Sequence, residues 1–344
     1  MAISNLSPRV VSPRLAPVAS PSVKAPSTPA PAKPASAPVP SQPKPSLWQR
    51  FERWILSPYL NYVGKKGAQQ FMYPGRQADS TTPAQLGLQG QTLNFTSADG
   101  KTPISGWYIP AVPASDKTIV LAHGHGGQMG EMLSEYAPWL HKAGYNIVAF
   151  DFRGSGSSGG DRSTIGYEER DDLKAAIDQA VAKGGKNIAV LGVSQGGATA
   201  LEQAARDPRV NAVIDDCAFD SLYDAVLPRL QAATLNIGPL KIHYPFTKLG
   251  AQAIVDEVTK ETGEPVASTD PIKLMPKLAN RPVMIIHGAA DDETLPQDSV
   301  NLYNADPGTQ KSLWMVPGAG HAESYKTDPK DYQQRVLNFL QTSL

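Results

Sequence analysis

The sequence has 344 residues, with 32 Lys and Arg against 32 Asp and Glu and a single cysteine, Cys217. This length suffices for one large domain or two ordinary ones, and the balanced charge gives no reason to expect nucleic acid as a partner. One cysteine excludes an intrachain disulfide, and no stretch approaches the roughly 18 consecutive apolar residues of a membrane-spanning helix. Since the N-terminus also lacks the apolar core of a secretory signal, the sequence predicts a cytoplasmic protein.

The first 46 residues are rich in Pro, Ala and Ser and hold 12 of the 31 prolines. Proline removes backbone donors and favours extended conformations, and few large apolar side chains are present to offset the entropy of ordering. Residues 1–46 are therefore predicted to be a disordered tail. Residues 1–50 contain six Lys and Arg and no acid, so the remainder of the chain is mildly acidic.

An amphipathic helix is predicted after this tail, because four apolar side chains recur at helical spacing and Pro58 follows to end the helix. The four are Leu47, Phe51, Trp54 and Ile55. Residues 47–88 are interpreted as this helix and a linker. The apolar face of such a helix more commonly packs against the body of the protein. The alternative is a peripheral membrane or protein contact through residues 47–73.

Apolar strands alternate with helices from residue 89 to the end of the chain. Strands are predicted at 93–96 and 104–109, which form a hairpin, and at 118–122, 146–151, from 187 up to Ser194, 210–215, 283–286 and 313–316. Helices are predicted at 131–143, 167–181, directly after Ser194, 297–303 and 329–340. This alternation demands a parallel sheet covered on both faces, so residues 89–344 are predicted to form one α/β domain. Such sheets carry their chemistry outside the carboxyl ends of the strands.

Residues 219–278 interrupt this alternation with mixed helical signals. The predicted breaks are at Pro228, Pro239, Pro245 and Pro265. A plain connection would be much shorter, so this segment is predicted to be a helical cap over the strand ends. Its apolar residues either line the substrate entrance or pack on one another; they are Leu222, Leu227, Leu230, Leu235, Ile237 and Phe246.

A serine lies at the turn between a predicted strand and a predicted helix. The pattern Gly-x-Ser-x-Gly places Ser194 between Gly192 and Gly196, and glycines there let the strand and the helix approach closely. The pattern alone is weak evidence for a nucleophile, and the structural alternative is a serine that only caps the helix. The context of strand before and helix after favours a nucleophile at the sheet edge.

A serine nucleophile needs a base, and His321 is the best candidate among the six histidines. It lies in a Gly-rich loop after the last strand, without an apolar periodic face, which is a poor setting for a core histidine. The acid that orients this base is predicted at Asp291, with Asp292 as the alternative, since both follow the preceding strand. The chain order Ser, Asp, His is the one expected for this kind of turn.

Acyl transfer also needs donors for the developing oxyanion. The backbone N–H of Gln195 lies at the start of the helix after Ser194 and is predicted to be one donor. The turn His123-Gly124-His125-Gly126-Gly127 follows a buried strand and exposes its backbone. The second donor is therefore assigned to the N–H of His125.

Several of these segments together resemble the α/β-hydrolase family, in particular its esterase and serine-aminopeptidase-like branch. The matching segments are 123–127, 151–157, 192–196, His287-Gly288 with Asp291, and Gly320-His321. The resemblance covers the chain from about residue 90 and implies a mostly parallel eight-stranded sheet with helices on both faces, a Ser-acid-His triad and a cap after the sixth strand.

The sequence departs from the family pattern near the acid, because Pro296 comes one residue late. Counting from His287 selects Asp291, whereas counting back from Pro296 selects Asp292. The count from His287 is preferred because the strand end fixes that geometry. Asp215 and Asp216 are remote third candidates, since a few relatives take their acid from that position.

Other charged residues receive structural interpretations. Arg153 and Asp151 are expected to organise loops beneath the site by ion pairing. Four acidic residues suit the first turn of a helix, namely Glu168, Glu169, Asp171 and Asp172. Cys217 ends an apolar strand and is predicted to be a buried, inert thiol. No metal site and no cofactor are predicted.

The function predicted from these residues is cleavage of carboxylic esters of a small-molecule acyl substrate through an acyl-enzyme. A peptidase or a thioesterase would use the same residues. The alternative of another class is a non-catalytic binding protein anchored through its tail. The sequence makes no prediction of the oligomeric state.

Overall fold

The computed structural model describes residues 46–237, 240–278 and 281–344, and the side chains of residues 47–53 and 235–240 lie outside that description. The tail predicted for residues 1–46 therefore falls outside the described residues, apart from Ser46. Residues 51–344 form one compact unit, which carries every feature discussed below.

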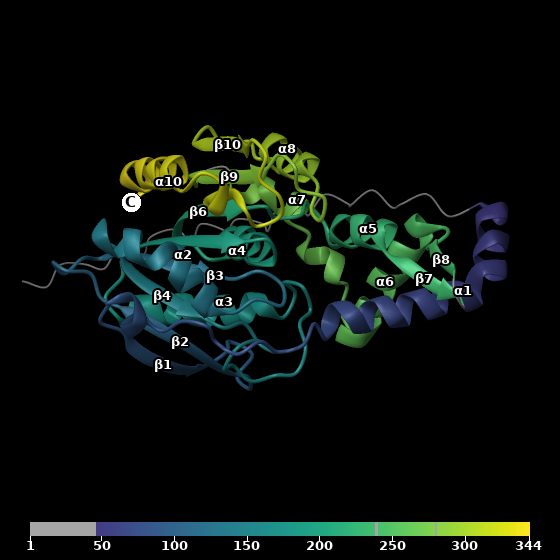
Figure 1. Cartoon of the computed structure of the whole chain (residues 1–344), viewed down its shortest axis with the longest axis horizontal. Coiled ribbons are helices and arrows are strands. Elements are labelled where there is room, and N and C mark those ends of the chain that lie inside the picture. The colour runs from purple at the N-terminus through teal and green to yellow at the C-terminus, as the bar shows by residue number, and fades with distance from the viewer. Residues whose placement is uncertain (1–45, 238–239, 279–280) are drawn as a thin grey trace, which may run out of the picture. The chain divides into compact units, whose positions relative to one another are not determined.

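An eight-stranded sheet organises this unit, in the order β1-β2-β4-β3-β5-β6-β9-β10 (Figure 1). β1 and β2 form the predicted antiparallel hairpin, β2 also pairs antiparallel with β4, and every pair from β4 to β10 is parallel. The mostly parallel eight-stranded sheet expected from the sequence is confirmed. The strands are β1 (Gln91–Thr96), β2 (Pro103–Ile109), β3 (Lys117–Ala122), β4 (Asn146–Phe150), β5 (Asn187–Val193), β6 (Val210–Asp216), β9 (Val283–Gly288) and β10 (Lys311–Val316).

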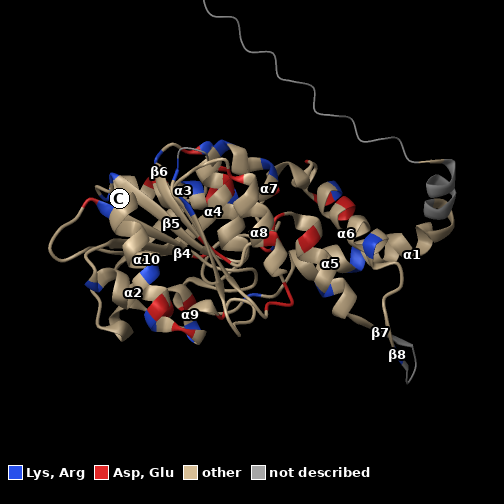
Figure 2. Cartoon of the chain, turned by 90° about the horizontal axis from the view of Figure 1, so that it is seen from above, with Lys and Arg blue, Asp and Glu red and all other residues tan. Residues whose placement is uncertain are grey.

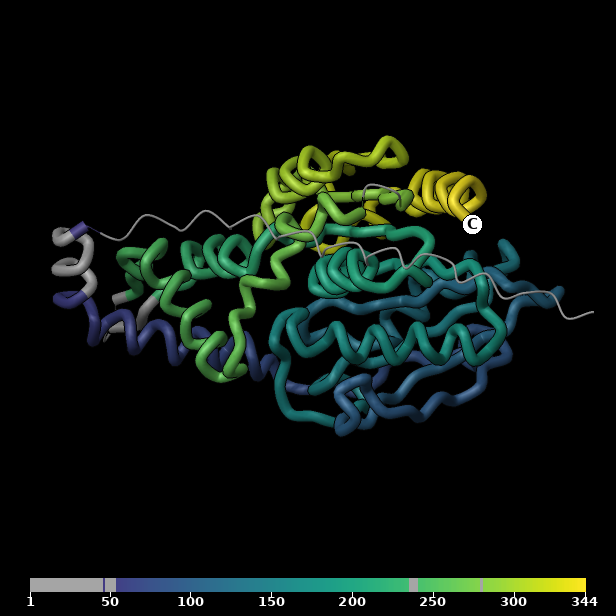
Figure 3. The backbone as a smooth tube through the Cα atoms, turned by 180° about the vertical axis from the view of Figure 1, so that it is seen from behind, coloured from purple at the N-terminus to yellow at the C-terminus, as the bar shows by residue number. Residues whose placement is uncertain are grey.

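Helices cover both faces of the sheet. Alternate residues of β3 show this arrangement, because Val120 packs in one buried cluster with α3 and α4, whereas Leu121 packs in another with α2 and α10. Seen from behind, α3 and α4 lie side by side across the sheet (Figure 3). The helices of this layer system are η1 (Pro83–Leu86), α2 (Met129–Lys142), α3 (Glu169–Ala182), α4 (Gln195–Arg206), α8 (Pro296–Ala305), α9 (Ser324–Thr327) and α10 (Pro329–Ser343).

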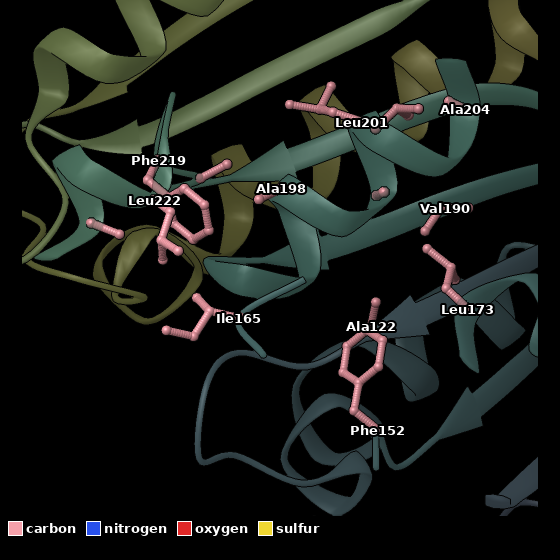
Figure 4. Packing of buried hydrophobic residues seen from close by; sticks show 14 of the residues in the cluster. Ala122, Phe152, Ile165, Leu173, Val190, Ala198, Leu201, Ala204, Phe219 and Leu222 are labelled. Carbon is pink, nitrogen blue, oxygen red and sulfur yellow. The ribbon is translucent and has the colours of Figure 1, made fainter. Parts of the chain in front are cut away.

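Small side chains on α4 bring that helix close to the sheet. Ala198, Leu201 and Ala204 lie along the helix face that packs in the same buried cluster as Val190 of β5 (Figure 4). The strands β4 and β5, which lie inside the sheet, carry no charged residue (Figure 2). Strands buried on both faces are expected to lack charge. The small side chains of α4 therefore let the helix that follows Ser194 pack closely against the sheet.

The segment between β6 and β9 has two parts: α5, the β7–β8 hairpin and α6 lie beyond the strand ends, whereas α7 and η3 pack against α4 (Figure 1). It is not purely helical as predicted, since β7 and β8 form a small antiparallel hairpin within it. Pro228 does not break a helix but lies inside α5, where burial of Val226, Leu230 and their neighbours stabilises the helix despite the lost hydrogen bond. The elements are α5 (Leu222–Ala232), β7 (Thr234–Ile237), β8 (Leu240–His243), α6 (Thr247–Thr262), η2 (Val266–Thr269), α7 (Pro271–Leu274) and η3 (Met275–Leu278).

The apolar residues of the cap differ in their positions. Leu222 is buried in the core, and Leu230 lines a cavity described below. Phe246 is exposed and contacts the ring of Tyr59 edge to face. The side chains of Leu235 and Ile237 lie outside the described residues.

Helix α1 (Leu47–Met72) runs beside the cap (Figure 1). The predicted stop at Pro58 is wrong, because the helix continues through that proline, and the buried side chains of Val63, Ala68 and Met72 anchor its second half. Docking of the first half is also not observed for Trp54 and Ile55, which are 71% and 55% exposed.

Two glycines set the contact between α1 and α6. A Cβ on Gly64 would lie 2.8 Å from the carbonyl oxygen of Ala253, and one on Gly67 would lie 2.3 Å from the side chain of Ile254. At Gly64 the two helices therefore touch at a separation that only glycine permits, whereas at Gly67 the Ile254 side chain would have to move. Among the described residues, no helix is both long and apolar enough to cross a membrane.

Candidate active site

Ser194 occupies a strained turn between β5 and α4. Its backbone angles, φ 54° and ψ −117°, are rare for a residue with a side chain, and its N–H donates a hydrogen bond of 2.7 Å to the carbonyl of Asp216. The flanking glycines are required, because a Cβ on Gly192 would lie 2.2 Å from the carbonyl oxygen of Gly196, and one on Gly196 would lie 2.1 Å from that of Ala122. The turn therefore presents the Ser194 hydroxyl at the carboxyl edge of the sheet.

His321 lies between Ser194 and Asp291. Its Nε2 is 3.0 Å from Ser194 Oγ, and its Nδ1 is 2.8 Å from Asp291 Oδ2. Since a carboxylate only accepts, Nδ1 carries the proton and Nε2 is the atom that accepts from the hydroxyl. The three residues follow β5, β9 and β10, so the parallel sheet brings together side chains that are far apart in sequence.

The surroundings of Asp291 favour its ionised form. Its carboxylate accepts hydrogen bonds from the N–H groups of Glu293 and Thr294 and from the Thr294 hydroxyl, and His287 Nε2 lies 3.2 Å away. Burial acts to raise the pKa of Asp291, but hydrogen bonds from His287 and His321 outweigh it and hold the pKa well below its usual range. Thr294 and His287 as supports of this carboxylate were not foreseen, although both lie in the segment that supplied the acid.

The other candidate acids have different positions. Asp292 is exposed, and no hydrogen bond connects it with His321. Asp215 accepts from the N–H of Ala218 beneath α4, and Asp216 accepts from the hydroxyl of Ser324. Burial raises the pKa of Asp215 to about 8 and that of Asp216 to about 6. The geometry thus selects Asp291 as the carboxylate that orients His321.

The two predicted oxyanion donors lie on either side of Ser194. Gln195 begins α4, and a Cβ on Gly124, the residue before His125, would lie 3.5 Å from Ser194 Cβ. Within the described residues, neither the Gln195 N–H nor the His125 N–H has a hydrogen-bond acceptor. Both N–H groups are therefore free to donate to a ligand.

The first histidine of the loop after β3 has a structural place. His123 is buried, its Nδ1 donates to the carbonyl of Gly124, and its Nε2 accepts from the N–H of Phe152. Burial lowers the pKa of His123 to about 4, so the ring is neutral. Because it joins the loops after β3 and β4, His123 holds the position of the neighbouring His125.

Arg153 organises the loops beneath the site by ion pairing, as predicted. Its guanidinium contacts carboxylates of Asp99, Glu168 and Asp172, of which Asp172 is fully buried. Asp151 does not share in this pairing, and the prediction that it would is wrong. Its carboxylate instead accepts backbone N–H groups, those of Met129 and Ser157, because it lies at the turn after β4 where N–H groups point inward.

A cavity of about 420 Å³ opens beside Ser194 and His321. Charged side chains reach into it from four segments, and two ion pairs lie there, Lys326 with Glu135 and Arg229 with Glu293. Glu131 adds another carboxylate to the lining. The volume lies within the range that binds small molecules.

A model of the alpha/beta hydrolase family matches residues 119–332, which is more than half of the chain. The chain belongs to this family. The match spans β3 to α10 and so includes Ser194, Asp291 and His321.

This α/β-hydrolase is similar to the uncharacterized protein YfhR of Escherichia coli, with 29% identity over 285 residues that cover 80% of this chain and 87% of YfhR. Among solved structures it is similar to the esterase Pf2001 of Pyrococcus furiosus, with 23% identity and a TM-score of 0.64 over 79% of this chain and 99% of that chain. An acylaminoacyl peptidase of Pyrococcus horikoshii is also similar, with 18% identity and a TM-score of 0.55 over 75% of this chain and 42% of that chain. At these identities the two structures show a shared fold.

One group of side chains in the described part of this α/β-hydrolase has the spacing of a metal site, namely Cys217, Asp291 and His321. Two of these side chains already have another role, since His321 Nδ1 and Asp291 Oδ2 form a hydrogen bond with each other. Burial raises the pKa of the Cys217 thiol well above its usual value, so the thiol stays protonated. The donor set therefore suits a hydrogen-bonded chain better than a metal ion.

Proposed function

We propose that this α/β-hydrolase is a serine hydrolase that cleaves carboxylic esters through an acyl-enzyme. The observation that carries the proposal is the continuous contact from Ser194 Oγ through His321 to Asp291, with both hydrogen bonds of 3.0 Å or less. A serine hydroxyl becomes a useful nucleophile when a neighbouring neutral histidine accepts its proton and a carboxylate fixes the tautomer.

The first half of the reaction forms the acyl-enzyme. His321 Nε2 takes the hydroxyl proton while Ser194 Oγ attacks the acyl carbon, and the N–H groups of His125 and Gln195 donate to the oxyanion. His321 then gives this proton to the oxygen of the leaving alcohol as the carbon–oxygen bond breaks. In the second half, water takes the place of the alcohol and attacks the acyl carbon while His321 Nε2 accepts its proton. His321 then returns this proton to Ser194 Oγ as the bond between Oγ and the acyl carbon breaks, which releases the carboxylic acid and restores Ser194.

The same residues would cleave amides or thioesters, and one observation favours an amino-containing substrate as the second candidate. Three glutamates line the cavity beside Ser194, of which Glu135 and Glu293 are paired with cations, and the carboxylate of Glu131 would bind an ammonium group. The similarity to an acylaminoacyl peptidase agrees with this alternative. Turnover of aminoacyl p-nitroanilides in preference to esters would establish it.

The test of the proposal is hydrolysis of p-nitrophenyl esters, together with labelling by a fluorophosphonate probe. We expect Ser194→Ala to lower kcat by at least about 10³-fold and to abolish labelling. Ser312→Ala, which removes an exposed hydroxyl on β10, serves as the matched control and should leave both unchanged. Absence of probe labelling in the folded wild type would overturn the proposal and favour a non-catalytic binding protein.

A further inference from the structure

A second cavity, of about 490 Å³, lies beyond the loop that carries His125. It shares His125 and Arg229 with the cavity beside Ser194, so the two meet at those residues. Ser194 and His321 line only the first. A substrate attached to Ser194 therefore has two adjacent spaces available for its two halves.

Helix α1 forms one wall of this second cavity, which we call the α1 cavity. The lining from α1 includes Val63, Lys66, Gln70 and Phe71, and these residues precede the segment 119–332 that matches the family. The close contact of Gly64 and Gly67 with α6 holds the helix in this position. This wall of the α1 cavity is therefore formed by residues that lie outside the segment matched by the family model.

The opposite wall of the α1 cavity comes from the cap. Leu230 and Ala233 contribute from the end of α5, Ile254 from α6 and Tyr244 from the segment between β8 and α6. No Asp or Glu lies among the lining residues within the described part of the chain. The α1 cavity combines apolar side chains such as Phe71, Leu230 and Ile254 with polar ones, and its charge is confined to Lys66 and Arg229. It is more apolar than the cavity beside Ser194, which is lined by three glutamates and two cations.

The chemistry of the proposed reaction decides which half of the substrate enters which cavity. His321 delivers a proton to the leaving oxygen, so the leaving alcohol must lie on the side of His321. That side is the charged cavity, which contains His321, Glu135 and Lys326. The acyl group then extends past His125 in the other direction.

We propose that the α1 cavity binds the acyl group, and that the substrate class is an ester of an apolar acyl chain with a polar alcohol. This inference rests on the proposed ester hydrolysis at Ser194. Apolar side chains of α1 and the cap remove the acyl chain from water, and this burial favours binding of a longer chain. The ion-paired side chains beside Ser194 face the hydroxyl groups or charges of the alcohol.

The first test compares two neighbouring alanines. Ala233→Phe places a ring in the α1 cavity, while Ala232→Phe places the same ring on an exposed position of α5 that does not line it. We expect kcat/KM for p-nitrophenyl octanoate, relative to acetate, to fall about tenfold in Ala233→Phe, as for a misfit in an apolar pocket, and to stay at the wild-type ratio in Ala232→Phe. Equal ratios in the two variants would overturn the proposal.

The second test addresses α1 itself. Gln70 lines the cavity and Gln69 does not, although both are exposed residues of the helix. Gln70→Trp is expected to shift the preferred acyl chain to a shorter length, and Gln69→Trp to preserve the wild-type profile. Thermal unfolding of each variant, followed by circular dichroism, checks that the chain is folded, and an unchanged profile in folded Gln70→Trp contradicts the role of α1.

Binding to inactive protein separates this inference from the proposed function. In the Ser194→Ala background, calorimetric titration with octanoate should show binding that Ala233→Phe weakens and Ala232→Phe does not. If the wild type turns over esters but neither profile nor binding responds to Ala233→Phe, the acyl assignment fails while the function stands. If no ester is cleaved in a Ser194-dependent manner, the function itself has failed.

Discussion

His125 Nδ1 lies 3.0 Å from the side-chain oxygen of Gln195, so the two residues proposed as oxyanion donors are joined through their side chains. Gln195 Oε1 also accepts from the hydroxyl of Ser163. Burial lowers the pKa of His125, which keeps the ring neutral, with the Nδ1 proton directed at the amide oxygen. The loop after β3 and the start of α4 are thereby fixed relative to each other on both sides of Ser194.

Removing this connection should slow the chemical step while leaving substrate binding nearly intact. Gln195→Ala keeps its backbone N–H, so we expect kcat to fall by about tenfold, less than the 10²–10³-fold that loss of a donor costs. KM should change little. Steady-state kinetics on p-nitrophenyl butyrate measure both quantities, and Gln203→Ala, farther along α4, is the control. A wild-type kcat in Gln195→Ala would mean that the side-chain contact has no part in positioning the donors.

The choice between two adjacent aspartates can be tested directly. Asp291→Asn removes the carboxylate that fixes the His321 tautomer, so kcat is expected to fall by about 10³–10⁴-fold. Asp292→Asn changes an exposed side chain and should alter kcat by less than about twofold. The reverse result would show that the acid is Asp292.

Stability should fall as the pH rises, because several buried carboxyls are protonated in the folded state. Asp215 has its pKa raised to about 8 by burial, whereas an unfolded Asp titrates near 3.9. Between these values the folded chain holds a proton that the unfolded chain has lost, which costs at most about 1.4 kcal/mol for each pH unit. Asp215→Asn removes the contribution of Asp215 to this dependence.

The measurement is urea unfolding between pH 5 and pH 8 of the wild type and of Asp215→Asn. The free energy of unfolding of the variant, relative to the wild type, should rise steadily across this range. A difference that stays constant with pH would show that Asp215 is ionised in the folded protein.

Arg153 should be far more important for stability than a surface cation. Arg153→Met leaves the fully buried Asp172 without its partner, and we expect a loss of about 3–5 kcal/mol in the free energy of unfolding. The double variant Arg153→Met with Asp172→Leu should be more stable than the single one. Lys174→Met, which breaks an exposed pair with Asp178, is the control and should cost less than about 1 kcal/mol. A single variant no worse than this control contradicts the prediction.

The contact between α1 and α6 predicts that Gly64→Ala lowers the stability of the protein, although the higher helix propensity of alanine alone would raise it. Gly64→Ala gains about 1 kcal/mol of helix propensity, but its Cβ would meet the backbone of Ala253 at 2.8 Å, and overpacking of this kind costs about 1–3 kcal/mol. Gly67→Ala meets the end of the Ile254 side chain, which can rotate, so its cost should be smaller. Thermal unfolding midpoints of the two variants give the comparison, and a raised midpoint in Gly64→Ala would refute it.

The sheet, its covering helices and the loop positions of Ser194 and His321 could be predicted because local periodicity and glycine spacing encode them. Each strand predicted for the main sheet is present, and a parallel sheet places the carboxyl ends of its strands on one edge. Pro58 and Pro228 misled the prediction. In α5, burial of neighbouring side chains outweighs the local cost of Pro228, whereas in α1 the nearest buried side chain after Pro58 is that of Val63.

By itself, the sequence determined that Ser194 and His321 lie in loops at strand ends and the order of the elements that carry them, because those depend on residues close together along the chain. Only the tertiary structure decided that Asp291 rather than Asp292 contacts His321, that Gln195 is bonded to His125, and that α1 closes a cavity beside them. Each of these depends on distances between segments that are far apart in sequence. Strand register and the packing of helices fix such distances, and no local pattern of residues specifies them.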